Sequence, residues 1–150
     1  MTRTNAREIA AQLVYEMNFH SGDDAAAVVD AHLEPDYYAT LRTEDEAYAE
    51  SVGAKQLSYI EDTVRGVWEK REELDGYISK YAIGWNINRI SRIARAIMQL
   101  AMYECLYVHD VPVSAAINEA VELTRKYEDE DVVSFVNGIL GAFAREVEGR

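Results

Sequence analysis

The chain has 150 residues, of which 49% are hydrophobic and 28% are charged. This length suffices for one ordinary domain, so we expect a single domain over residues 1–150, and the lack of an apolar run of about 20 residues excludes a membrane span. The formal net charge of −12 excludes the class of proteins that bind nucleic acid through an overall positive charge.

The N-terminal stretch contains two acidic residues, Glu8 and Glu16, and has no small-residue cleavage site, so it is not predicted to be a secretory signal. We therefore expect a cytoplasmic protein. The single cysteine, Cys105, can form no internal disulfide and lies in an apolar helical stretch, where it is expected to be a buried packing thiol.

Helical periodicity runs through nearly the whole chain, and no segment alternates as a strand does. Asn5, with Glu8 three positions later, is expected to cap the first helix, and Pro35 is expected to break the pattern in a mobile stretch. Asp131 is placed as the N-cap of the last helix. The prediction is an all-α bundle of about seven helices, with helical stretches over residues 5–20, 21–33, 57–68, 72–81, 88–108, 114–127 and from 131 onward.

The last helix contains the sequence "SFVNGILG", in which an Asn-Gly pair typical of hairpins lies within a helical apolar pattern. Glycines in a helix cost roughly 1 kcal/mol each relative to alanine. Because Gly138 and Gly141 are three residues apart on one face, we expect a neighbouring backbone to approach them closely. For Asn137 both a structural and a surface role stay open.

No pattern of catalytic residues is visible, so an enzyme is not expected. His20, His32 and His109 lack the spacing of metal ligands, and the acidic joint "EDED" at 128–131 lacks the glycine and alternation of a calcium loop. There is no glycine-rich phosphate loop. We therefore expect neither a metal nor a cofactor.

The charges are unevenly distributed. Residues 23–50 hold nine acids and one base, whereas the other segments share 18 acids and 14 bases. The acidic segment is suited to a basic protein partner. Arginines gather at Arg3 and Arg7, and again at Arg89, Arg92 and Arg95, where either a solvated helix face or a surface for a phosphate backbone fits the pattern.

Several stretches resemble, in order and spacing, the transcription antitermination factor NusB family. The resemblance implies a seven-helix protein that pairs with NusE, a small-subunit ribosomal protein, and binds boxA RNA, so that RNA polymerase in the antitermination complex reads through terminators of ribosomal RNA operons. Residues 21–56 are dissimilar and are expected to be a variable, partly mobile insertion. The matching stretches are "AREIAAQLVYEM" at 6–17, "VRGVWEKREELDGYISKY" at 64–81, "RISRIARAIMQLAMYECLY" at 89–107, "DVPVSAAINEAVELTRKY" at 110–127 and "SFVNGILGAFA" at 134–144.

The resemblance also implies an RNA surface and assigns Tyr15 to the protein partner. Phosphate contacts are expected from the arginines, and Phe135 is expected to stack on an unpaired base or, in the competing interpretation, to belong to the core. Family members begin with a dense arginine run that this chain lacks, which predicts weaker RNA binding by the protein alone. The implied RNA-binding residues are Arg3, Arg7, Arg95, Gln99, Asp131 and Phe135.

Two other functions stay open from the sequence. A NusB-like helical domain also resembles the N-terminal part of ribosomal RNA cytosine methyltransferases, although this chain ends at Arg150 without a parallel-sheet catalytic domain. Alternatively, the chain is a protein-interaction module that does not bind RNA. The sequence does not determine the oligomeric state, and a homodimer is left open.

Overall fold

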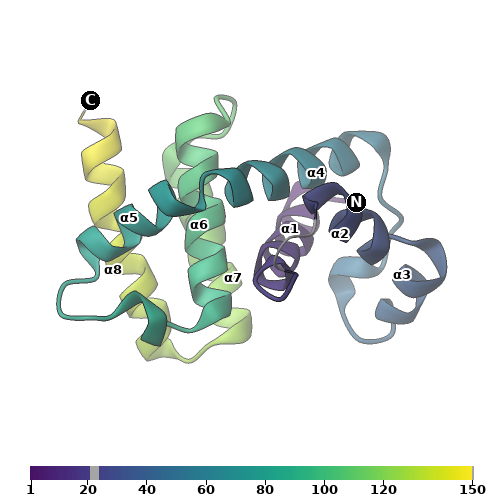
Figure 1. Ribbon diagram of the computed structural model, residues 1–150, viewed down its shortest axis with the longest axis horizontal. Coiled ribbons are helices and arrows are strands. Elements are labelled where there is room, and N and C mark those ends of the chain that lie inside the picture. Colours follow the sequence, from purple (N-terminus) through teal and green to yellow (C-terminus); the bar gives the residue numbers. More distant parts are fainter. Residues whose placement is uncertain (21–23, 150) are drawn as a thin grey trace. The chain divides into compact units, whose positions relative to one another are not determined.

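The computed structural model describes residues 1–20 and 24–149 (Figure 1). Across these residues the chain forms eight α-helices and two 3₁₀ turns, with no strand, so the predicted all-α class is confirmed. The elements are α1 (Arg3–Met17), α2 (Ala25–His32), α3 (Pro35–Leu41), η1 (Glu46–Tyr48), α4 (Ala54–Glu69), α5 (Arg71–Tyr81), η2 (Ile87–Arg89), α6 (Arg92–Tyr107), α7 (Val113–Tyr127) and α8 (Glu130–Glu148).

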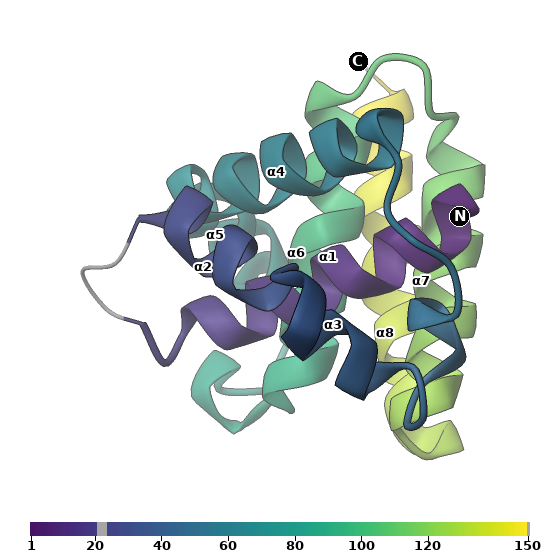
Figure 2. The same ribbon diagram turned by 90° about the vertical axis from the view of Figure 1, so that its right-hand side faces the viewer.

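The helices form two compact units, of which the first is Met1–Trp68. In this unit α2 and η1 pack on α1, and α3 packs on η1 (Figure 2). The buried side of α1 carries Ile9, Leu13 and Met17, which recur at helical spacing and are fully buried. Tyr48 brings η1 into this apolar interior, with 1% of its surface exposed.

The second unit is Glu69–Arg150, and within it α6, α7 and α8 pack against one another (Figure 1). Helix α5 packs on both α6 and α8. Phe143 of α8 is fully buried and meets the ring of Tyr77 edge-on, with the centroids 5.0 Å apart. The apolar stripes predicted for these helices therefore form the interior of this unit.

Two predicted helix caps are wrong by a few residues. The first helix is capped by Thr2, whose Oγ1 accepts a hydrogen bond from the Asn5 backbone N–H at 3.1 Å, while Glu8 lies buried inside the helix. Helix α8 is capped by Asp129, which accepts from the Val132 N–H at 3.1 Å, and Asp131 lies in the first turn. Acidic residues are favourable throughout a helix's first turn, so composition alone did not single out the cap.

Pro35 begins a helix instead of a mobile stretch. It occupies the first turn of α3, where its missing N–H costs nothing, and the Glu34 carboxylate accepts from the backbone N–H groups of Asp36 and Tyr37. The dissimilar segment thus contains α2, α3 and η1. Its residues 21–23 lie outside the part of the chain that the structure describes.

No close helix crossing involves Gly138. A Cβ built on Gly138 would have no neighbour within 4 Å, and one on Gly141 would meet only the Arg145 Nη1 atom at 3.7 Å. Gly138 is exposed, and the opposite face of α8 buries Val136, Leu140 and Phe143. The expected close approach is therefore wrong, and burial of that apolar face compensates for the glycines.

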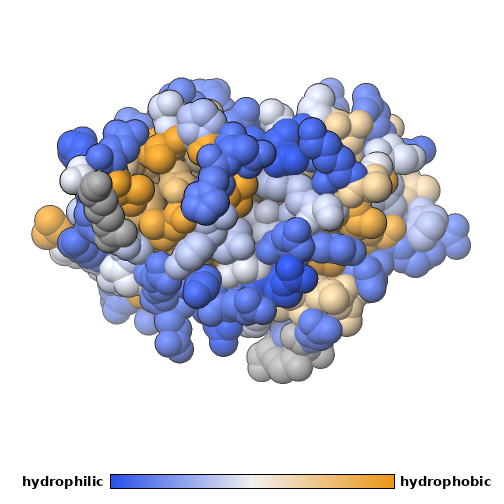
Figure 3. Space-filling model, turned by 90° about the horizontal axis from the view of Figure 1, so that it is seen from above, coloured by the Kyte–Doolittle hydropathy of each residue, from blue (hydrophilic) through white to orange (hydrophobic). Residues whose placement is uncertain are grey.

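The surface is mainly hydrophilic on the face shown in Figure 3, with hydrophobic side chains visible in patches. No helix among the described residues is long and apolar enough to cross a membrane. Cys105, expected to be a buried packing thiol, is half-buried, and this burial together with Glu104 and Glu148 raises the pKa of its thiol to about 12.

Candidate nucleic-acid interface

The two arginines of α1 lie over one aromatic ring of α4. The Cζ atoms of Arg3 and Arg7 are 4.0 Å and 6.0 Å from the ring centroid of Tyr59. Arg3 Nε also donates a hydrogen bond to Gln56 Oε1 at 2.9 Å. The ring attracts both cations and orients them, so this pair of arginines is brought together as the sequence suggested.

These two arginines differ in how much of their surface a ligand could reach. Arg7 exposes only 8% of its surface, whereas Arg3 is half-buried. Both are part of the packing between α1 and α4 through Tyr59. A phosphate at this site would be contacted mainly by Arg3.

Arg95 and Gln99 of α6 converge on one carboxylate of α5. Asp75 accepts from Arg95 Nη2 at 2.6 Å and Nε at 3.1 Å, and from Gln99 Nε2 at 2.7 Å. The ion pair is about three-quarters buried, because Arg95 exposes 26% and Asp75 22% of the side chain. A forked pair of this kind fixes the guanidinium and neutralises its charge.

Phe135 lies beside a second large aromatic side chain. Its ring centroid is 5.2 Å from that of Trp85, and the ring planes are tilted by 55°. Phe135 is half-buried, whereas Trp85 is 61% exposed. Gly84, with a φ of 82°, lets the chain leave α5 in a left-handed conformation just before Trp85. The pair offers an aromatic surface, partly open to solvent, on which a base could stack.

Asp131 and Tyr15 both reach the surface. Asp131 is exposed in the first turn of α8, one turn before Phe135. In the first unit, Tyr15 is 36% exposed and meets Phe19, which is 55% exposed, edge to face at 5.3 Å. The Tyr15–Phe19 pair is thus an exposed aromatic patch at the end of α1.

The turn between α5 and α6 carries further positive charge. The side chain of Arg89, on η2, is exposed and makes no hydrogen bond or ion pair with any described residue. Arg92, at the start of α6, is also exposed. Of the arginine series noted in the sequence, Arg89 and Arg92 are therefore the more exposed members, and Arg95 is held by the Asp75 carboxylate.

The structure groups the predicted residues within each unit. Arg3 and Arg7 share Tyr59 in the first unit, while Arg95 and Gln99 share Asp75 in the second. Sequence reasoning did not identify Tyr59, Asp75 or Trp85. Of the missed residues, only Trp85 has a local signal, since a tryptophan directly after a turn glycine is a candidate for exposure.

The described residues contain no group of three or more His, Cys, Asp or Glu side chains arranged to hold a metal ion. By its fold, the chain belongs to the class of small all-helical proteins built from helices that pack within two units. The NusB family profile matches residues 4–145.

Named relatives extend this match over nearly the whole chain. The transcription antitermination protein NusB of Symbiobacterium thermophilum is 39% identical over 99% of this chain and 93% of its own length. The NusB protein of Ruminiclostridium cellulolyticum is 38% identical over 97% of this chain and 90% of its own length. The chain belongs to the NusB family, which confirms the resemblance seen in the sequence.

Solved structures agree with this assignment. T. maritima NusB superposes with a TM-score of 0.76 at 28% identity, over 97% of this chain and 92% of that protein. A chain in the crystal structure of a plectonemic RNA supercoil has a TM-score of 0.75 at 22% identity, over 97% and 96% of the two chains. The second likeness supports the fold alone.

Proposed function

We propose that this protein is a non-enzymatic transcription antitermination factor that binds the boxA RNA of ribosomal RNA operons together with NusE. Membership of the NusB family, whose named relatives are transcription antitermination proteins, supports this assignment. In this proposal this protein and NusE together join the RNA polymerase antitermination complex. The single structural observation that carries the RNA-binding part is the partly exposed pair of aromatic rings formed by Trp85 and Phe135.

The aromatic pair supplies the stacking contribution to RNA binding. Single-stranded RNA is recognised largely by stacking of unpaired bases on aromatic side chains, and each such contact contributes about 1–3 kcal/mol. Trp85 is exposed enough to meet a base with little change in the fold. Phe135 supports the Trp85 ring from α8 and offers its own exposed part to a neighbouring base.

The arginines supply the phosphate contacts, but several are engaged within the protein. Arg95 is paired with Asp75, and Arg7 is mostly buried, so each contributes less than a free cation would. Arg3, Arg89 and Arg92 remain more accessible. Few of the arginines implied to bind RNA are accessible, and the net charge is −12, which predicts weak RNA binding by the protein alone, to be strengthened by the basic partner.

A second candidate function is a protein-interaction module that does not bind RNA. The Arg95–Asp75 ion pair favours this alternative, because it neutralises one of the implied RNA-binding cations. The other alternative, a NusB-like helical domain detached from a ribosomal RNA cytosine methyltransferase, is less well supported. The named relatives are NusB proteins, and this chain covers 90% or more of their length.

Fluorescence anisotropy with labelled boxA RNA and a scrambled RNA of equal length separates the two candidates. An antitermination factor binds boxA RNA more tightly than the scrambled RNA, and Phe135→Ala reduces this preference in protein that remains folded. An interaction module shows no preference, with or without NusE. The folded state of each variant is checked by circular dichroism and a thermal melt.

A further inference from the structure

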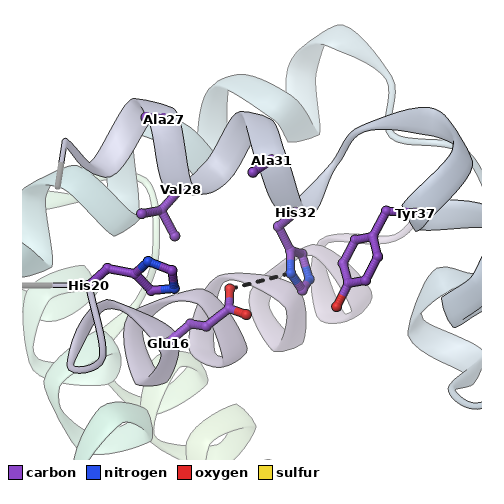
Figure 4. Close-up of a pocket in the computed structure, with 7 residues that line it drawn as sticks. All are labelled: Glu16, His20, Ala27, Val28, Ala31, His32 and Tyr37. Atoms are coloured by element: carbon purple, nitrogen blue, oxygen red, sulfur yellow. Dashed lines mark ion pairs between the residues drawn. The ribbon is translucent and has the colours of Figure 1, made fainter.

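A pocket of about 470 Å³ opens at the end of α1 in the first unit and is independent of the residues assigned to RNA (Figure 4). Glu16 of α1 and His32 of α2 point toward each other across it, and Tyr37 of α3 stands beside the imidazole. Val28 and Ala31 of α2 form an apolar part of the wall. The pocket thus combines a carboxylate, an imidazole and an aromatic ring with an apolar side.

A chain of hydrogen bonds determines which nitrogen of His32 carries the proton. Gln12 Nε2 donates to Asp45 Oδ2 at 3.0 Å, so the amide oxygen of Gln12 is left to accept, and the hydroxyl of Tyr48 donates to it. The Tyr48 oxygen, 2.6 Å from His32 Nε2, must then accept the Nε2–H proton. His32 Nδ1 is consequently a lone-pair acceptor.

This Nδ1 acceptor is buried and has no hydrogen-bond partner among the described residues. His32 exposes only 8% of its surface, and Glu16 Oε2, which is itself an acceptor, lies 3.5 Å from the Nδ1 atom. Burial lowers the pKa of His32 by more than the Glu16 carboxylate raises it, so the ring stays neutral at neutral pH. Two acceptors therefore face one another without a donor between them, in a pocket open to solvent.

We propose that this pocket receives the guanidinium group of an arginine side chain from a basic protein partner. Guanidinium presents neighbouring N–H donors in a planar fork, so one donor can reach Glu16 Oε2 while the next reaches His32 Nδ1. The methylene groups of the arginine would lie along Val28 and Ala31. Tyr37 adds an aromatic ring beside the cation.

The charge of the surrounding segment supports a basic partner. Residues 23–50, which supply α2, α3 and η1, hold nine acids against the single base Arg42. A field of this sign attracts a basic segment and raises its association rate. A metal ion fits less well, because the described residues contain no group of three suitable ligands. Lysine fits less well too, since its ammonium group is a compact point charge without the planar fork.

The proposal is tested by NMR on ¹⁵N-labelled protein, with the ring nitrogens of His32 assigned by their loss in His32→Gln. Acetyl-arginine amide is the probe, and acetyl-lysine amide and the neutral isostere acetyl-citrulline amide are the controls. We expect arginine to shift the His32 Nδ1 resonance saturably, lysine to bind more weakly and citrulline to leave the resonance unchanged.

Two variants of the pocket and one control variant outside it locate the contact. Glu16→Gln is expected to weaken arginine binding by about tenfold, which corresponds to one charge-assisted hydrogen bond. Glu44→Gln removes the same charge from an exposed position outside the pocket and should leave binding nearly unchanged. Ala31→Leu, which fills the apolar wall from an exposed helix position, should abolish binding while the protein stays folded.

Four results would overturn the proposal. Equal effects of Glu16→Gln and Glu44→Gln would show that only the general negative charge attracts the probe. Equal binding of arginine and lysine would show that the pocket does not recognise the planar guanidinium group. A His32 ring that is already protonated at neutral pH would leave no acceptor at Nδ1. A response to Zn²⁺ alone, without one to arginine, would make the pocket a metal site. None of these outcomes depends on whether the protein binds RNA.

Discussion

Asp75 holds Arg95 through two parallel hydrogen bonds, from Nη2 at 2.6 Å and from Nε at 3.1 Å. The same carboxylate accepts from Gln99, so two of the residues implied to bind RNA are already bound to one acid. A phosphate at Arg95 must compete with that carboxylate. Under the proposed function, this internal ion pair would limit RNA binding in addition to the small number of arginines.

Asp75→Asn is expected to strengthen RNA binding, because it releases the charge of Arg95 for a phosphate. Affinity for boxA and scrambled RNA should rise alike, and the slope of log K against log salt should steepen by ~0.7, the value for one phosphate contact on a single strand. Asparagine keeps one acceptor oxygen for the donors of Arg95 and Gln99, so the loss of this mostly buried ion pair should cost on the order of 1–3 kcal/mol, and a thermal melt checks that the variant is folded.

The matched control is Asp62→Asn, which frees Arg65 from an exposed ion pair on α4 that includes none of the proposed RNA residues. Anisotropy titrations at several salt concentrations measure both variants. An unchanged slope in folded Asp75→Asn protein would exclude Arg95 as a phosphate ligand.

Trp85→Ala should weaken boxA binding by about 1–3 kcal/mol without altering the salt dependence, because stacking displaces no counterions from phosphates. The melting midpoint should change little, since the ring is 61% exposed. Ile83→Ala is the control, because Ile83 is 85% exposed on the same turn but carries no aromatic ring. Similar losses in both variants would indicate an apolar contact and not stacking.

Gly138→Ala is expected to raise the free energy of unfolding by up to about 1 kcal/mol, because alanine is the better helix former and a new Cβ meets no neighbour within 4 Å. In a chain of this size that gain raises the melting midpoint by about 2–4 °C. Gly84→Ala should have the opposite effect, since Gly84 has a φ of 82°. A lowered melting midpoint for Gly138→Ala would contradict this expectation and would indicate the close helix contact at Gly138 that the sequence suggested.

The stability of the fold should decrease as the pH falls below about 6.5, the ordinary pKa of histidine. His32 is neutral in the folded protein, because burial lowers its pKa against the opposing effect of Glu16, whereas the unfolded chain takes up the proton. The contribution of the neutral His32 ring to the stability of the fold is fully present above pH 6.5 and is lost as the pH falls toward the lowered pKa of His32. The groups facing the ring are Glu16, Tyr37 and Tyr48, and His20 lines the same pocket.

Urea unfolding across this pH range measures that effect in the wild type, in His32→Gln and in His109→Gln. The first variant should show a smaller fall in stability on acidification. The second removes an exposed histidine and should follow the wild type. Parallel curves for all three proteins would assign the acid sensitivity to other groups.

The sequence predicts the long helices well because their apolar residues recur at helical spacing, as in α6 and α8. Helix starts are less predictable: any of the four acids at residues 128–131 can stabilise a first turn, and only geometry selects Asp129 as the cap. Pro35 illustrates the same ambiguity, since proline both ends one helix and suits the beginning of another.

The candidate site is predictable in its residue types but not in their partners. Arg3 and Tyr59 are far apart in the sequence, and so are Arg95 and Asp75, so their contacts arise only from helix packing. A charged residue noted in a sequence carries no indication of whether a carboxylate already neutralises it. Exposure of Trp85 is likewise set by the turn at Gly84 and the position of Phe135.

The most direct test of the antitermination proposal measures the affinity of labelled boxA RNA for this protein with and without saturating NusE. The proposal predicts weak binding by the protein alone and tighter binding with NusE, and linkage requires boxA RNA to tighten the protein pair by the same factor. That reciprocal factor is checked by titrating NusE with and without RNA. Equal RNA affinity in the presence and absence of NusE would contradict the account.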